Sequence, residues 1–161
     1  MLFRSRHKDR VRVFNFALGE KEGEQQIFVT VDYDESSSLL RSTDTCYRIY
    51  PFTRKQQPLV VRMETLDGVI APLRETLSPE ILIKLDVQGY ENRVIKVGLQ
   101  TFRKAKACVI EICLDLLYEQ QASFDELLVL LRSLGFSYAG NLEQSYAQDG
   151  HLIFIDGVFV K

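Results

Sequence analysis

The stretch that most constrains the fold runs from Ile81 to Glu91 and reads Ile-Leu-Ile-Lys-Leu-Asp-Val-Gln-Gly-Tyr-Glu. Its first part is a short aliphatic run interrupted only by Lys84, which is typical of a strand buried in a parallel sheet and too short for a helix. Asp86 stands where this strand ends, and Gly89 permits a tight turn before a helical pattern begins near Tyr90. In open α/β sheets ligands bind beyond the carboxyl ends of the strands, so Asp86 is a candidate site residue.

Asp86 and Glu91 also have a purely structural interpretation. An acid after a strand often caps the following helix, and an acid in the first turn of a helix is favoured by the helix dipole. The spacing alone leaves both interpretations open, because strand-to-helix turns use aspartate so often.

Strands and helices alternate along most of the chain, which predicts an α/β fold. Helices are expected to begin at Thr65, near Tyr90 and at Ser123, where Ser123 and Glu126 have the spacing of a capping box. Strands are predicted at residues 11–17, 26–32, 58–63, 81–87, 107–114, 136–139 and 152–160. We therefore expect one domain over residues 1–161, with a mainly parallel sheet, helices on both faces and an antiparallel pair of closing strands.

The composition narrows the class of protein. The chain has 161 residues, of which 46% are hydrophobic, and this suits one globular domain with a single core. A net charge of -2 gives no support for a nucleic-acid partner, and no apolar run approaches the ~20 residues of a membrane span. The basic cluster from Arg4 to Arg12 is interpreted as a solvated terminus, with phosphate or lipid contact as the alternative. Cys46, Cys108 and Cys113 indicate buried thiols and hence a cytoplasmic protein.

A second carboxylate, Glu111, lies within an apolar strand and is costly to bury unless it is paired. With Asp86 it would form a pair of acids on adjacent strand ends, able to share a proton, hold a divalent ion or bind a substrate hydroxyl or amine. The alternative is a salt bridge from Glu111 to Lys84 or a nearby arginine. Ser37 and Ser38 belong to a serine run that is either a flexible loop or a source of hydroxyl donors.

Several of these pieces together resemble the FkbM-type family of S-adenosylmethionine-dependent methyltransferases. The matching pieces occur in the family's order between about Val11 and Val160: residues 15–19 (Asn-Phe-Ala-Leu-Gly), 37–39 (Ser-Ser-Leu), 65–67 (Thr-Leu-Asp), 84–91 (Lys-Leu-Asp-Val-Gln-Gly-Tyr-Glu), Glu111 and 156–159 (Asp-Gly-Val-Phe). The resemblance implies a Rossmann-like class I methyltransferase fold with a terminal antiparallel hairpin. It also implies methyl transfer from S-adenosylmethionine to a hydroxyl of a small molecule, such as a sugar or a polyketide.

The resemblance also suggests a role for each candidate residue. The residues carried over are Asp86 and Glu111 as catalytic groups, Ala17, Leu18 and Asp86 as cofactor-binding groups, and Ser37, Ser38 and Glu91 as substrate-binding groups. A carboxylate such as Asp86 would act as the base or orient the acceptor hydroxyl. No residue is assigned to a metal.

The chain departs from the family pattern at its start. The family has a glycine-rich turn after the first strand and an acid at the end of the second, and neither is found before Val11, so the chain resembles the C-terminal two-thirds of a member. Without those strands the edge at residues 81–87 is expected to lie open and to favour homo-oligomers. Two alternatives stay open: a non-catalytic α/β interaction domain that associates through this edge, and another doubly wound enzyme whose cofactor loop lies elsewhere.

Overall fold

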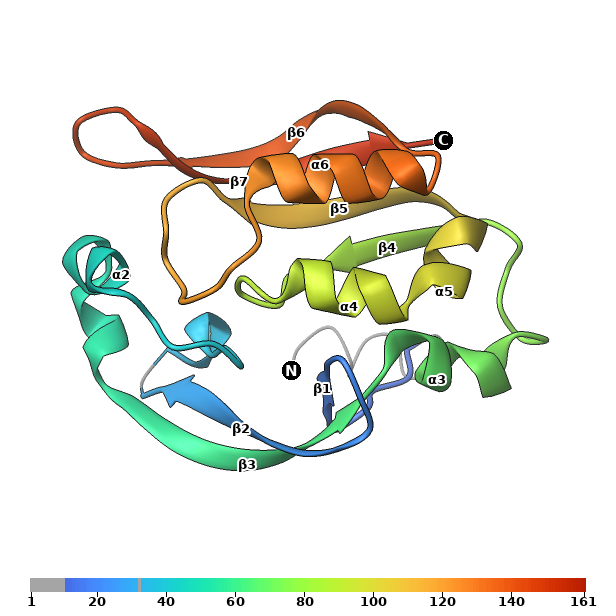
Figure 1. Ribbon diagram of the computed structural model, residues 1–161, viewed down its shortest axis with the longest axis horizontal. Helices are drawn as coiled ribbons and strands as arrows, with labels where there is room; N and C mark the ends of the chain where they lie inside the picture. The colour runs from blue at the N-terminus through green and yellow to red at the C-terminus, as the bar shows by residue number, and fades with distance from the viewer. Residues whose placement is uncertain (1–10, 32) are drawn as a thin grey trace.

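Two separate β-sheets carry the fold in the computed structural model, which describes residues 11–31 and 33–161 (Figure 1). The first sheet has the order β1-β3-β2 and consists of β1 (Ala17–Leu18), β2 (Gly23–Thr30) and β3 (Gln56–Glu64). The second has the order β4-β5-β7-β6 and consists of β4 (Ile81–Leu85), β5 (Ala105–Cys113), β6 (Ser137–Tyr146) and β7 (Leu152–Val160). The basic residues between Arg4 and Arg10, and Asp32 at the end of a predicted strand, lie outside the described residues.

The helices are short and begin where local signals place them. They are α2 (Asp44–Ile49), α3 (Leu66–Ile70), α4 (Glu91–Val97), α5 (Leu99–Lys104) and α6 (Phe124–Ser133), with 3-10 helices η2 (Asp34–Ser36), η3 (Pro51–Arg54) and η4 (Ala71–Leu73). Thr65 caps α3 by accepting from the amide of Gly68, and the predicted capping box of Ser123 and Glu126 is confirmed. None of the described helices has the length and apolar character needed to cross a membrane.

Strand directions correct the prediction of one mainly parallel sheet, because both sheets are mixed. β1 pairs with β3 and β4 with β5 in parallel, whereas β2–β3, β5–β7 and β6–β7 are antiparallel. β2 and β3 are antiparallel neighbours, and the segment that connects them begins after Thr30 and ends at Gln56, its cross-strand partner. The parallel β4–β5 pair and the antiparallel closing pair were both expected from the sequence and are confirmed.

Two strands differ most from the prediction. A strand was predicted at residues 11–17, but the observed β1 contains only Ala17 and Leu18. These two residues pair with Met63 and Glu64 of β3. β6 continues to Tyr146 through a segment predicted as a loop. This segment reads as polar because β6 lies at an edge of its sheet and most of its side chains are exposed.

The helices α4, α5 and α6 all lie on one side of the four-stranded sheet (Figure 1). The prediction of helices on both faces is therefore corrected for these three. The buried core on this side is built from aliphatic and aromatic side chains of β5, β7, α4 and α6, namely Cys108, Ile110, Ile112, Ile153, Ile155, Phe159, Val94, Ile95, Leu127 and Leu131. The opposite face carries polar groups, among them the cross-strand pair Glu111 and Asp156. Charged side chains of β5 and β7 thus lie on the face away from α4, α5 and α6.

Within the described residues β4 forms an edge of its sheet, and its Leu82 is 67% exposed. An open apolar edge pairs readily with another chain, so we predict that the protein self-associates as its concentration rises through the micromolar range. Leu82→Lys should shift it towards monomer, because a charge on an edge strand opposes pairing. Sedimentation velocity measures this, with Val129→Lys on the exposed face of α6, 68% exposed, as the control expected to change nothing. A wild-type protein that stays monomeric at all these concentrations contradicts the prediction.

Candidate functional site

A cavity of about 520 Å³ lies beyond the carboxyl ends of β4 and β5. Its size is ordinary for a small-molecule pocket, for which volumes of about 300–1,000 Å³ are typical. Its charged lining residues are all acidic, Glu35, Asp86 and Glu111, and its walls are aromatic, from Tyr33, Tyr50, Phe52, Tyr118 and Phe154. We call it the acidic cavity. The two strand-end carboxylates singled out in the sequence therefore meet in one cavity, because β4 and β5 run parallel and end at the same edge.

Gln88 connects these two carboxylates. Its side-chain amide donates to Asp86 Oδ1 at 2.8 Å and to Glu111 Oε1 at 2.7 Å, and its side-chain oxygen accepts from the Tyr118 hydroxyl at 2.5 Å. Its backbone carbonyl accepts from the Ser38 hydroxyl at 2.7 Å. The backbone of Gln88 has φ +53°, a left-handed conformation that non-glycine residues adopt at a cost of about 1 kcal/mol or more. The hydrogen bonds on both sides of the residue offset this cost.

The turn that presents Gln88 is supported from beneath by Glu91. The Glu91 carboxylate, in a residue only 3% exposed, accepts from the backbone amides of Val87 at 3.1 Å and Gly89 at 3.2 Å. Burial raises the pKa of Glu91 to about 7, against the lowering effect of these hydrogen bonds. Gly89 has φ +90°, and a Cβ there would lie 3.1 Å from the Tyr118 side chain. Glu91, predicted to bind substrate, thus lies behind the turn and not among the residues that line the cavity.

Glu111 is an acidic group of the cavity whose pKa is strongly raised. Burial first, and then the charge of Asp86, raise its pKa to about 8, so the carboxyl holds its proton at neutral pH. The alternative partner, Lys84, directs its ammonium to Asp156 at 2.5 Å and lies 3.7 Å from Asp86 Oδ2. The close partner of Glu111 is therefore the Gln88 amide and not a salt bridge.

The serine run contributes to the site mainly through the backbone that it holds. Ser38 is 1% exposed and donates to the Gln88 carbonyl, and the Ser37 hydroxyl accepts from the amide of Thr30 at 3.2 Å. The member of the serine run that lines the acidic cavity is their neighbour Ser36. Both hydroxyls are hydrogen-bonded within the protein and neither residue lines the cavity, and the substrate contacts expected of Ser37 and Ser38 stay a prediction.

Ala17 and Leu18 lie away from the acidic cavity, in β1 of the other sheet. Ala17 lines a different cavity of about 520 Å³, together with Phe16, Ile27 and Leu59, and Leu18 packs against the core. The two cavities share no lining residue. The cofactor contact expected of Ala17 and Leu18 stays a prediction.

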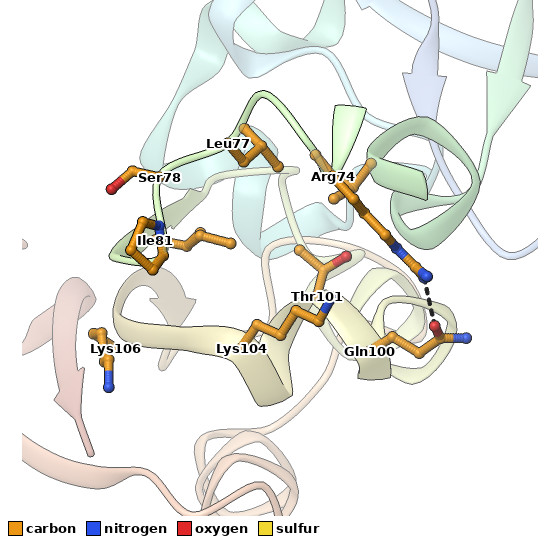
Figure 2. A pocket seen from close by; sticks show the side chains of 10 residues that line it. Arg74, Leu77, Ser78, Ile81, Gln100, Thr101, Lys104 and Lys106 are labelled. Atoms are coloured by element: carbon orange, nitrogen blue, oxygen red, sulfur yellow. Dashed lines mark hydrogen bonds between the residues drawn. The ribbon is translucent and has the colours of Figure 1, made fainter. Parts of the chain in front are cut away.

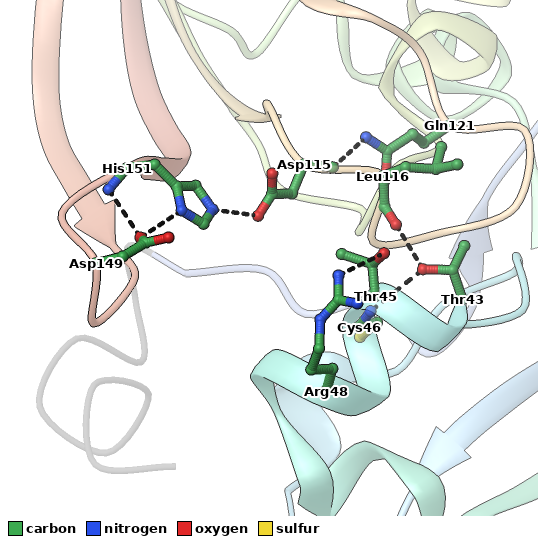
Figure 3. Close-up of polar contacts among 9 residues, drawn as sticks. All are labelled: Thr43, Thr45, Cys46, Arg48, Asp115, Leu116, Gln121, Asp149 and His151. Carbon is green, nitrogen blue, oxygen red and sulfur yellow. Dashed lines mark hydrogen bonds and ion pairs between the residues drawn. The ribbon is translucent and has the colours of Figure 1, made fainter.

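A histidine bridge fixes the loop that closes one side of the acidic cavity (Figure 3). The His151 ring lies between two carboxylates, with Nδ1 2.6 Å from Asp149 and Nε2 2.8 Å from Asp115, and these hydrogen bonds raise the pKa of His151. Thr43 at the start of α2 donates to the Leu116 carbonyl. The β6–β7 turn, the loop after β5 and α2 are therefore held together around the cavity.

Gln88 and Tyr118 are site residues that the sequence pattern does not single out. The only sequence feature that points to Gln88 is its position between a strand-end acid, Asp86, and a turn glycine, Gly89. Its left-handed backbone brings the side chain to Asp86 and Glu111. Tyr118 has no comparable signal, because it lies in an irregular loop and reaches Gln88 across 30 positions of the chain.

The chain matches one family model, the methyltransferase FkbM domain, over residues 3–138. The match includes four residues that line the acidic cavity, namely Asp86, Gln88, Glu111 and Tyr118. It covers both sheets up to the beginning of β6. No curated protein and no solved structure matches the chain.

We predict that Glu111→Gln stabilises the protein progressively as pH rises from about 4.5 to about 8. In this range the folded protein keeps the Glu111 proton, whose pKa is raised to about 8, whereas the unfolded carboxyl has lost it above its ordinary 4.5. The stability contributed by the neutral carboxyl is therefore present below pH 4.5 and is lost as pH rises through 8, and glutamine does not share that loss.

Urea unfolding at several pH values measures this effect. Relative to wild type, the variant should gain up to about 5 kcal/mol between the two ends of the range, because each unit of pKa difference corresponds to about 1.4 kcal/mol. Glu143→Gln on exposed β6 is the matched control, expected to differ from wild type by a constant amount. A Glu111→Gln difference that is equally constant with pH would show that Glu111 titrates normally.

Proposed function

The chain belongs to the FkbM methyltransferase family, and on that premise we propose that it transfers a methyl group from S-adenosylmethionine to a hydroxyl oxygen of a small molecule held in the acidic cavity. The proposal rests on the pair Asp86 and Glu111, which lie at the carboxyl ends of two parallel strands and both accept a hydrogen bond from the Gln88 side-chain amide. A cleft at the carboxyl edge of a sheet is the usual place for ligands in α/β proteins.

The residues of the cavity suit the reactive end of this cofactor. S-adenosylmethionine supplies an electrophilic methyl group on a positively charged sulfur. The described lining of the cavity has three carboxyl groups and no basic side chain, and its aromatic rings offer faces that attract cations. Among the described side chains, Gln88 donates a hydrogen bond to Asp86, and the Lys84 ammonium lies 3.7 Å from it. Asp86 is therefore the group best placed to bind the positive charge.

Proton transfer can be assigned to Asp86. A hydroxyl must lose its proton as its oxygen takes the methyl group, and the Asp86 side chain is 42% exposed at the cavity, where it can accept that proton. Glu111 is neutral up to about pH 8, so the pair carries a single negative charge at neutral pH. Gln88 holds both carboxyls in place, which leaves the protonated Glu111 to donate a hydrogen bond to the acceptor oxygen and orient it.

The aromatic walls favour an acceptor that has an apolar face. The Tyr33 and Phe52 rings meet edge to face at 4.9 Å between centroids, and Tyr50 lies 5.9 Å from Phe52. Such a wall buries the flat side of a ring while the carboxyls bind its hydroxyls. Sugars and polyketides both have this character, and the wall supports them equally.

The open edge of β4, with its exposed Leu82, favours a second candidate function. It is a non-catalytic α/β domain that associates with another chain through this edge. Such a domain would bind a partner and would have no affinity for the cofactor, so cofactor binding separates the two candidates.

We predict that the 161-residue chain binds S-adenosylmethionine saturably in a calorimetric titration. Asp86→Asn should weaken this binding by roughly tenfold or more, because it removes a carboxylate that faces the charged sulfur. It should slow methyl transfer by about 10²–10⁴-fold in an S-adenosylhomocysteine release assay with hydroxyl acceptors.

The control is Asp125→Asn, an exposed acid on α6 outside the acidic cavity, which should leave both quantities unchanged. No heat at high micromolar cofactor would contradict the proposal and favour the interaction domain. Equal binding by wild type and Asp86→Asn would instead place the cofactor elsewhere in the protein.

A further inference from the structure

A second cavity, of about 420 Å³, lies at the opposite end of the same two strands (Figure 2). It is lined at Ile81, the first residue of β4, and at Lys106, near the start of β5. Because β4 and β5 are parallel, these residues lie at the amino edge of the sheet, whereas Asp86 and Glu111 lie at the carboxyl edge. The second cavity is therefore distinct from the acidic cavity, and the two share no lining residue.

The lining of this second cavity combines aliphatic surface with positive charge. Its apolar side chains are Ile70, Leu77, Pro79 and Ile81, and its charged side chains are Arg74, Lys104 and Lys106. No acidic residue lines it, and we call it the basic cavity. Figure 2 shows Leu77 and Ile81 on one side and the long cationic side chains of α5 and the η4 region on the other.

None of its three cations is neutralised by a carboxylate in the part of the chain that the structure describes. Arg74 donates to the side-chain oxygen of Gln100 at 2.5 Å, and neither it nor Lys104 or Lys106 takes part in an ion pair there. Glu75 and Glu80 belong to neighbouring segments of chain but do not line the cavity. Three unpaired positive charges around one hollow produce a positive potential that attracts anions.

One carboxylate near this cavity, Asp67, already accepts hydrogen bonds from two residues that line it, Gln100 and Thr101. Asp67 accepts from the amides of Gln100 at 3.0 Å and Thr101 at 2.8 Å, and from the Thr101 hydroxyl at 2.6 Å. These bonds join α3 to the first turn of α5 and hold the Asp67 carboxylate at the helix start. Asp67 is thus positioned by α5 and does not compensate the lysines at the other end of that helix.

The carboxyl end of α5 is covered by a further cation. The Lys161 ammonium donates to the carbonyls of Phe102 at 2.9 Å and Arg103 at 2.6 Å, which are the groups that would otherwise present negative charge. Burial lowers the pKa of Lys161, and repulsion from Lys106 lowers it further, against the opposing effect of Cys108. The surroundings of Lys104 and Lys106 are therefore positive on the helix side as well.

We propose that the basic cavity binds a small amphiphilic anion, a phosphate or carboxylate group carried on an aliphatic chain. The cations bind the anionic group, and the aliphatic side chains bury the hydrocarbon. A bare ion would make only the first of these interactions, and a neutral alcohol only the second. Either a free metabolite or the headgroup region of an anionic lipid has this chemistry. Binding here is independent of the methyl transfer proposed above, since it uses the other end of the sheet.

The test is a binding titration of the 161-residue chain with octyl phosphate below its micelle concentration, followed by calorimetry and by the methyl NMR signals of Ile70 and Ile81. We expect saturable binding that shifts both methyl signals. Octanol and inorganic phosphate should each bind roughly tenfold more weakly or worse, because each offers half of the complementary chemistry.

The double variant Lys104→Gln, Lys106→Gln should weaken octyl phosphate binding by roughly three- to tenfold, the range expected when two exposed charge contacts are lost. Both lysines are exposed, so the fold is retained, which circular dichroism checks. The matched control Lys21→Gln, Lys55→Gln removes the same charge from the three-stranded sheet region and should leave the affinity within about twofold of wild type.

Three results would overturn the proposal: no saturation, equal binding of octanol and octyl phosphate, or equal loss in the two double variants. Sedimentation with vesicles identifies the source of the anion once octyl phosphate binds. Binding to anionic but not neutral vesicles, reduced by the Lys104→Gln, Lys106→Gln variant, assigns the cavity to a lipid headgroup. Absence of vesicle binding assigns it to a free amphiphile.

Discussion

The site depends on a single side-chain amide that satisfies two carboxyl groups at once. Asp86 and Glu111 stand at the ends of adjacent parallel strands, where two charges of the same sign would repel each other. The Gln88 amide has two N–H groups and donates to both carboxyls, and the pKa of Glu111 is raised to about 8, so one of the two stays neutral. An arrangement of this kind keeps two acids close together in a partly buried place with only one net charge.

The contacts around Gln88 fix the position of its side-chain amide. Tyr118 and Ser38, both almost completely buried, bind its side-chain and backbone oxygens, and they come from segments far apart in the sequence. Glu91 supports the turn below, and Gly89 leaves the room that the Tyr118 ring needs. The acidic cavity lies at the carboxyl edge of β4 and β5, and the basic cavity lies at their amino edge, where Lys106 of β5 and Lys104 of α5 line it.

The sequence predicted those features that local signals determine. The strand at Ile81, the cap at Thr65 and the capping box at Ser123 follow from short patterns, and the structure has all three. Features that depend on a distant partner were predicted less well. Residues 11–16 have the composition of a strand but no partner within the described chain, and residues 140–146 read as a loop because an edge strand can be polar. Pairing, and not propensity, decided both cases.

The candidate site shows the same division. Composition and position were enough to bring Asp86 and Glu111 to one cavity, but a charge pattern cannot show whether a carboxyl faces solvent or a backbone amide. Glu91 faces backbone amides and is buried, and the hydroxyls of Ser37 and Ser38 are bound inside the protein. The role of Gln88 requires its left-handed backbone, which the tertiary contacts around the turn hold and for which the sequence offers only the position between Asp86 and Gly89.

An NMR titration of the wild-type protein tests most directly whether Asp86, Gln88 and Glu111 form one unit. It follows the carboxyl carbon of Glu111 together with the side-chain amide of Gln88 as pH is raised. We expect the Glu111 signal to titrate near pH 8 and the Gln88 amide to shift with the same midpoint, because the amide donates to the group that ionises. A Glu111 signal that titrates near its ordinary 4.5, with a Gln88 amide that does not respond, would contradict the linked site.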